Sequence, residues 1–208
     1  MKLNRSTTLL SAIVLSSAML TACGPKKVTR TSANSTEGGD LSGYWNDIDA
    51  NLVSQEMIND CLSRPWASNF QSENDGAKPV VKLMGVQKRT DDRNVNTQYF
   101  SKKLEREMLN SGRVRVVAAW GQDNVNLIER ARQARTADDE TAKSQGNEVG
   151  ADFTLQTIVN SQNETDGGGK SVRAYMVNME LVNVETNEKV WIGEKRIRKV
   201  IDQAGTTW

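Results

Sequence analysis

Residues 153–159 (FTLQTIV), 175–181 (YMVNMEL) and 190–197 (VWIGEKRI) decide the fold of this chain. Apolar and polar residues alternate through the first two stretches, as in half-buried strands, and the third is a further apolar-rich strand. Residues 185–188 (ETNE) suit a tight hairpin turn between the last two strands. The Gly-rich run 166–169 lies in a long loop, 160–170, that we expect to join the first two. Three consecutive antiparallel strands are therefore predicted at the C-terminal end.

Upstream, helical and strand patterns alternate. Apolar residues at helical spacing predict helices over 46–63, 97–110, from 123 or 124 onward, and 138–149, while short apolar runs predict strands over 79–87 and 114–118. Pro65 ends the first helix, and 67–78 is polar and expected to be a loop. The resulting order, α-β-α-β-α-α-β-β-β, predicts an α+β fold with a sheet of four to five strands and flanking helices.

The N-terminus has the pattern of a bacterial secretory signal. Lys2 and Arg5 precede an uncharged apolar stretch of about a dozen residues, too short to span a bilayer, and then Leu20-Thr21-Ala22-Cys23. That last sequence resembles the lipobox of bacterial lipoproteins, in which the Cys becomes the first residue and carries acyl chains. We therefore expect a signal peptide over 1–22 and lipidation of Cys23, which would tether the protein to a membrane. An ordinary cleaved signal is the alternative.

The segment after Cys23 is expected to be a flexible tether. Residues 24–42 are mostly Gly, Ser, Thr, Asn and Lys, a composition that buries too little apolar surface to fold. Residues 23–42 are thus the lipidated Cys and tether, and 43–208 the globular domain. Removing the signal leaves 25 basic and 26 acidic residues, a formal charge of −1, which argues against nucleic-acid binding.

Composition also limits the chemistry. The chain has no His, which excludes His-based general bases, His-containing catalytic triads and His metal ligands. Cys61, the second of the two Cys, lies in an amphipathic helical pattern and is expected to be a small core residue. There is no P-loop or dinucleotide fingerprint, and the acidic pairs lack the spacing of a calcium loop. We expect no enzyme activity, cofactor, metal site or small-molecule substrate.

Candidate contact residues are few. Trp120, between a predicted strand and helix, either closes the core or is an exposed binding anchor. The last strand carries Arg196, Arg198 and Lys199, preceded by Lys195, a basic stripe that either faces an acidic partner or protects a solvated edge strand. Trp66 is ambiguous in the same way as Trp120. Tyr44-Trp45 are expected to fasten the first helix to the domain, and Trp191 to pack on the sheet.

The ordered segments together resemble one known family. Tyr44-Trp45-Asn46, residues 80–86 (VVKLMGV), 111–118 (SGRVRVVA), 149–153 (VGADF) and 181–191 (LVNVETNEKVW) occur in this order behind a lipobox. They are similar to LpoB, a family of outer-membrane lipoproteins that activate bifunctional penicillin-binding proteins, over about residues 43–200. The resemblance implies a non-catalytic domain like the N-terminal domain of TolB.

The resemblance also implies a partner and a location. The domain would be anchored in the outer membrane, reach through the peptidoglycan and dock on a class A penicillin-binding protein, stimulating glycan polymerisation and crosslinking. Gly24 after the lipidated Cys is not the Asp that retains lipoproteins in the inner membrane. The alternative function is a non-catalytic adaptor of an envelope assembly or secretion machine, related to curli-type secretion lipoproteins. A periplasmic ligand binder would need a pocket of convergent polar groups, for which the sequence gives no sign.

Overall fold

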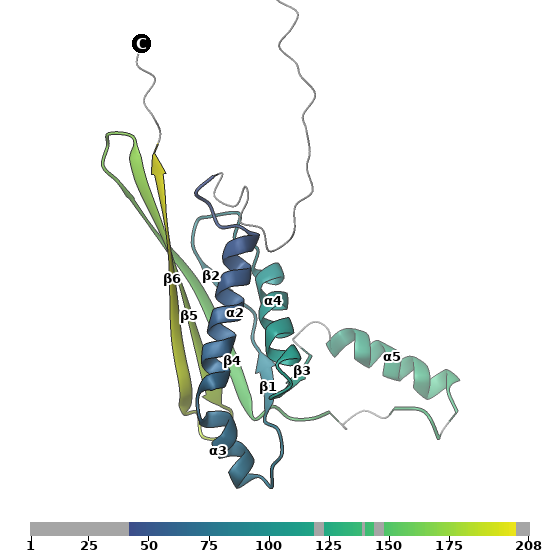
Figure 1. Ribbon diagram of the computed structural model, residues 1–208. Coiled ribbons are helices and arrows are strands. Elements are labelled where there is room, and N and C mark those ends of the chain that lie inside the picture. Colours follow the sequence, from purple (N-terminus) through teal and green to yellow (C-terminus); the bar gives the residue numbers. More distant parts are fainter. Residues whose placement is uncertain (1–41, 119–122, 139, 144–147, 203–208) are drawn as a thin grey trace, which may run out of the picture. The chain divides into compact units, whose positions relative to one another are not determined.

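Three long strands and the helices packed on one face of them enclose the core of the domain. The chain divides into two units, residues 1–35 and 36–208, and the computed structural model describes residues 42–118, 123–138, 140–143 and 148–202, all within the second unit (Figure 1). The elements in chain order are α2 (Asp47–Ser63), α3 (Trp66–Glu73), β1 (Val80–Leu83), β2 (Gln87–Arg89), α4 (Thr97–Asn110), β3 (Arg115–Val117), α5 (Asp123–Thr136), β4 (Phe153–Thr165), β5 (Lys170–Asn183) and β6 (Lys189–Asp202). None of the described helices is both long enough and apolar enough to cross a bilayer.

The described strands form one mixed sheet in the order β3-β1-β4-β5-β6, with β2 also paired to β4. β1 pairs in parallel with both β3 and β4, and the β4-β5-β6 meander is antiparallel. β1 and β2 follow one another along β4, since Val81–Leu83 pair with Phe153–Leu155 and Gln87–Arg89 with Ile158–Asn160. The predicted α+β class and C-terminal meander are confirmed, and β6 is an edge strand of the sheet.

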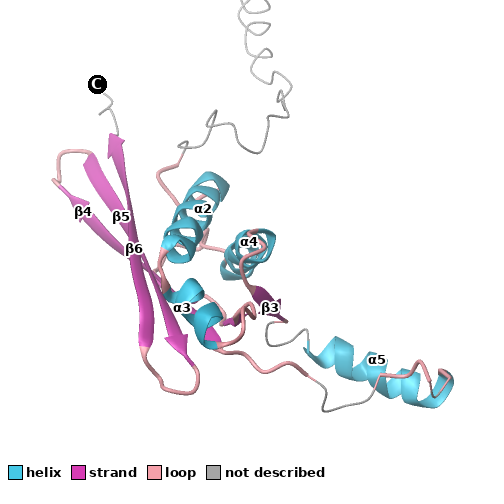
Figure 2. Cartoon of the chain, turned by 60° about the horizontal axis from the view of Figure 1, so that its bottom comes forward, coloured by secondary structure: helices cyan, strands magenta, loops and turns pink. Residues whose placement is uncertain are grey.

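One face of the sheet carries the helices. In Figures 1 and 2, α2, α3 and α4 all lie on the same side of β4, β5 and β6, which we call the inner face. The odd-numbered residues of 153–159, 175–181 and 191–201 point to it, as their pairing and burial show. The even-numbered residues form the outer face. The core lies between the sheet and helices, and Phe100, Leu104 and Met108 of α4 are fully buried in it.

Polar side chains cap the N-termini of α2 and α4. The Asn46 side chain accepts from Asp49 N–H at 3.0 Å while the Asp49 carboxylate accepts from Asn46 N–H at 2.9 Å, a reciprocal capping box. Asn96 caps α4 by accepting from Tyr99 N–H at 2.9 Å. These bonds satisfy amide groups that have no partner within the helix, so the helix starts are set locally.

Tertiary contacts overturn two of the predicted loops. Residues 67–78 are not a loop throughout, because α3 begins directly after Pro65 and packs Trp66 and Phe70 edge-on against Phe153 at ring-centroid distances of 5.1 and 5.6 Å. The predicted loop 160–170 is mostly strand, since β4 runs to Thr165 and β5 starts at Lys170. The turn is limited to 166–169, where the Asp166 carboxylate accepts from Gly168 N–H at 2.7 Å.

Among the described residues, one predicted helix is absent, and several apolar residues of predicted helices are exposed. The helix expected over 138–149 is absent from the described residues of that range, and Val149, one of its few apolar residues, is exposed. α5 forms as predicted, but Val125 and Ile128 are exposed. In the first helix, predicted from apolar residues at helical spacing, Leu52 is also exposed, whereas Val53, Met57, Ile58, Cys61 and Leu62 are buried. A helical period alone does not fix which residues meet the sheet.

Candidate functional site

The short segment before α2 is fixed firmly to the domain. The Trp45 indole is buried, with its ring edge-on to Phe100 and Tyr175 at centroid distances of 5.6 and 5.4 Å. The Arg173 guanidinium lies over the Tyr44 ring at 4.0 Å. Gly43 has φ +64, and a Cβ there would lie 2.4 Å from Cγ1 of Ile201, so the backbone approaches β6 closely. The expectation that Tyr44-Trp45 fasten the first helix is confirmed.

The Asp92 carboxylate accepts hydrogen bonds that hold the 43–46 segment in place. It accepts from Trp45 N–H at 2.9 Å, from Asn94 N–H at 2.8 Å and from the Tyr175 hydroxyl. Burial by itself would raise the pKa of Asp92, but these hydrogen bonds hold it below its usual value. Burial and the bond to Asp92 raise the pKa of Tyr175. The carboxylate therefore stays ionised and links the 43–46 segment to β5.

A polar ladder joins α2 to the inner face of β6. Trp191 Nε1 donates to Asp60 at 2.9 Å, Lys195 pairs with Glu56, and Lys199 Nζ lies 2.6 Å from the Asp49 carboxylate. The hydrogen bond from Trp191 lowers the pKa of Asp60, assisted by Arg64. Lys199 also donates to the Tyr44 carbonyl at 2.9 Å. The ladder uses every fourth residue of β6, all of one parity, because side chains of one parity share a face.

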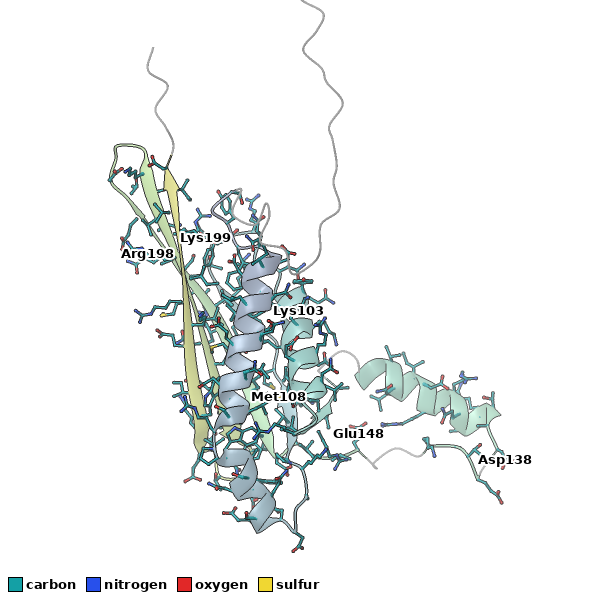
Figure 3. The ribbon with its side chains drawn as sticks, viewed as in Figure 1. Lys103, Met108, Asp138, Glu148, Arg198 and Lys199 are labelled. Carbon is teal, nitrogen blue, oxygen red and sulfur yellow. The ribbon has the colours of Figure 1, made fainter. Side chains whose placement is uncertain are left out.

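The predicted basic stripe is therefore two sets of residues. Lys199 is buried and, with Lys195, faces α2, so the structure does not place Lys199 on a single stripe with the arginines. Arg196 and Arg198 are exposed on the outer face, and Figure 3 labels Arg198 and Lys199 as neighbours on β6. Arg196 Nε donates to Glu194 at 2.6 Å. The alternation of the strand separates residues that are adjacent in sequence.

The two arginines line a shallow pocket on the outer face. Its volume is about 530 Å³, and its outer-face residues come from two rows across the sheet, Asn160–Met176–Arg196 and Gln162–Ala174–Arg198. Asn160, Gln162 and Met176 were not predicted as site residues, since they form no motif. Met176 lies between the apolar Tyr175 and Val177, which was an available signal, whereas both neighbours of Gln162 are polar and gave none.

The remaining candidates have simpler outcomes. Cys23 and Trp120 lie outside the described residues. Trp66 and Trp191 are buried, and Trp66 Nε1 donates to the Cys61 carbonyl at 2.7 Å, so Trp66 belongs to the core. Cys61 is buried as expected, and burial raises the pKa of its thiol to about 12, which leaves it protonated at neutral pH.

Comparison with known families identifies the chain. A family model described as the peptidoglycan-synthase activator LpoB matches residues 49–197, from the start of α2 to β6. The chain belongs to the LpoB family. The match covers α2 and most of the sheet, but not the 43–46 segment or the end of β6, and it confirms the resemblance drawn from the ordered sequence segments. LpoB-family membership makes this protein one of the peptidoglycan-synthase activators.

Several solved structures are similar to this LpoB-family chain. The LpoB C-terminal domain from Salmonella enterica is 19% identical, with 73% of this chain and 99% of that one covered and a TM-score of 0.44. The corresponding domain from Escherichia coli is 18% identical, with coverages of 72% and 98% and a TM-score of 0.45. Lipoprotein GNA1162 from Neisseria meningitidis is 14% identical, with coverages of 62% and 88% and a TM-score of 0.39. No curated protein sequence matches the chain.

Proposed function

We propose that this protein is an outer-membrane lipoprotein that binds and activates a bifunctional class A penicillin-binding protein and so regulates peptidoglycan synthesis. The family match over residues 49–197 carries the proposal. Residues 1–22 serve as the signal peptide, Cys23 carries the acyl chains, 23–42 form the tether and 43–208 form the docking domain. Several acyl chains provide the stable attachment that one chain does not.

The protein acts on its partner without catalysis of its own. It raises the rate of the synthase by binding an active conformer more tightly than an inactive one, with no cofactor or small-molecule substrate. Arg196 and Arg198 contact the synthase from the outer face, and Trp120 is a second contact. Lys199 supports the site from within, because its ion pair with Asp49 and its bond to Tyr44 hold β6 against α2.

The test uses the full acylated chain, extracted in detergent, with the class A penicillin-binding proteins of its own organism. We expect direct binding and a faster glycan polymerisation by one of them. Cys23→Ser is the matched variant for the anchor: it should bind the synthase in solution but leave the membrane fraction. Absence of binding to every class A synthase would overturn the proposal and favour the alternative, an adaptor of an envelope machine.

A further inference from the structure

The charged side chains that line the outer-face pocket are all positive. Its charged lining residues are Arg196 and Arg198, and no carboxylate lines it. Glu194 neutralises Arg196, whereas Arg198 has no ion-pair partner among the residues that the structure describes. The amides of Asn160 and Gln162 and the side chain of Met176 complete the rows beside them. The pocket therefore offers a guanidinium and amide donors above an apolar floor, which suits a carboxylate.

Apolar residues flank the pocket along β6. Ile192 and Val200 are 64% and 69% exposed and lie on the same face as Arg196. The three residues follow one another at four-residue intervals, so each is about 13 Å from the next along the strand. Arg and exposed apolar side chains together are typical of the centre of a protein interface. The stripe fits a segment that presents acidic residues between apolar ones.

The chemistry of the pocket favours a segment of a partner protein over a second copy of this chain or a glycan. A second copy of this chain would bring the same arginines against their equivalents in a two-fold contact, which like charges oppose. The one aromatic residue of the lining is Tyr175, whose ring is fully buried on the inner side, so the described pocket offers no exposed aromatic face on which a sugar ring would stack. Helices cover only the inner face among the described elements, which leaves this surface accessible (Figure 2).

Building on the proposed function, we infer that the outer-face pocket binds a carboxylate side chain of the synthase, with Arg198 as its principal partner and Ile192 and Val200 as apolar contacts on either side. An Asp or Glu of the partner accepts hydrogen bonds from the Arg198 guanidinium. Arg196 pairs with Glu194 in the free protein and can pair instead with the bound segment. The partner surface is thus an acidic segment, not glycan or lipid.

The test measures binding of the full chain to the synthase identified above. Arg198→Glu should raise the Kd at least tenfold, because it removes the ion pair and opposes the carboxylate with a like charge. Arg106→Glu is the matched control: this arginine is exposed on α4, in the helix layer on the inner face, and the same charge change there should leave the Kd unchanged. Both variants should unfold at the wild-type urea midpoint.

A second measurement identifies the contact. Arg198→Lys should retain binding and, with a carbodiimide, form an amide between its Nζ and a carboxylate of the synthase with loss of water, mapped by mass spectrometry. If wild type binds the synthase and Arg198→Glu binds equally well, the pocket inference is overturned while the proposed function stands. If the variant instead loses binding only to isolated sacculi or anionic vesicles, the inference is likewise overturned. If wild type binds no class A synthase, both proposals fall.

Discussion

Replacing Lys199 by Met tests whether this residue belongs to the interior. Lys199 lies 2.6 Å from the Asp49 carboxylate, with only 7% and 9% of the two side chains exposed, and donates to the Tyr44 carbonyl. Lys199→Met keeps the length of the side chain but removes the ammonium group that pairs with the buried Asp49 carboxylate. Removing one partner of a buried ion pair costs about 3–5 kcal/mol.

The expected cost can be refined from the contacts that remain. Asp49 keeps the hydrogen bond from Asn46 N–H, so its charge is not left without any donor. The Tyr44 carbonyl loses a hydrogen bond as well, which adds to the cost. With a urea m-value of about 2 kcal/mol/M, a loss of 3–5 kcal/mol lowers the urea midpoint by about 1.5–2.5 M.

The assay is urea unfolding followed by tryptophan fluorescence and circular dichroism, with Arg198→Met as the matched control. Arg198 is the next residue on the same strand but exposed, so its replacement should change the free energy of unfolding by no more than about 0.5 kcal/mol. In the double variant Asp49→Asn/Lys199→Met the buried charge is gone, and the loss should be smaller than the sum of the single losses. Equal midpoints for Lys199→Met and Arg198→Met would refute the assignment of Lys199 to the interior.

Three further predictions concern the same framework. Trp45→Ala should lower the free energy of unfolding by about 3–5 kcal/mol, because it empties the space between Phe100 and Tyr175; a change under 1 kcal/mol in urea unfolding would contradict the packing described. Asp92 has a lowered pKa in the folded state, so its stabilisation is present above the unfolded pKa of about 3.9 and is lost as the pH falls through the folded value. Asp92→Asn should therefore be less stable than wild type at pH 7, with the difference narrowing as the pH approaches 3; a constant difference in thermal unfolding across this range would show that the charge is not involved. Gly193→Ala should destabilise the domain by about 1–3 kcal/mol, since its Cβ would lie 2.3 Å from Cζ2 of Trp191 and force that ring away from Asp60; an unshifted melting temperature would argue against this contact.

Local sequence patterns were sufficient to predict the long strands and the first helix of the fold. Alternation predicted β4 and β5, because side chains on a strand point to opposite faces with a period of two, and the apolar residues of the last stretch predicted β6. The breaker at Pro65 ended the first helix as predicted, since proline acts on neighbouring backbone groups, and the Asn46 cap seen in the structure is equally local. By contrast, α3 was missed, because the packing of Trp66 and Phe70 on Phe153 depends on a residue more than 80 positions away.

The sequence by itself determined the resemblance to the family and the C-terminal meander, but it grouped Lys199 with Arg196 and Arg198 in one basic stripe on the last strand. It did not determine which face of that strand is covered. Only the tertiary structure decided this, by placing α2 on the odd-numbered side of β6 and pairing Asp49 with Lys199. The parity of a strand is a local property of the backbone, whereas its burial is set by elements that are distant in the chain. Lys199 therefore forms an ion pair in the interior, whereas Arg198, the residue before it, lines an exposed pocket.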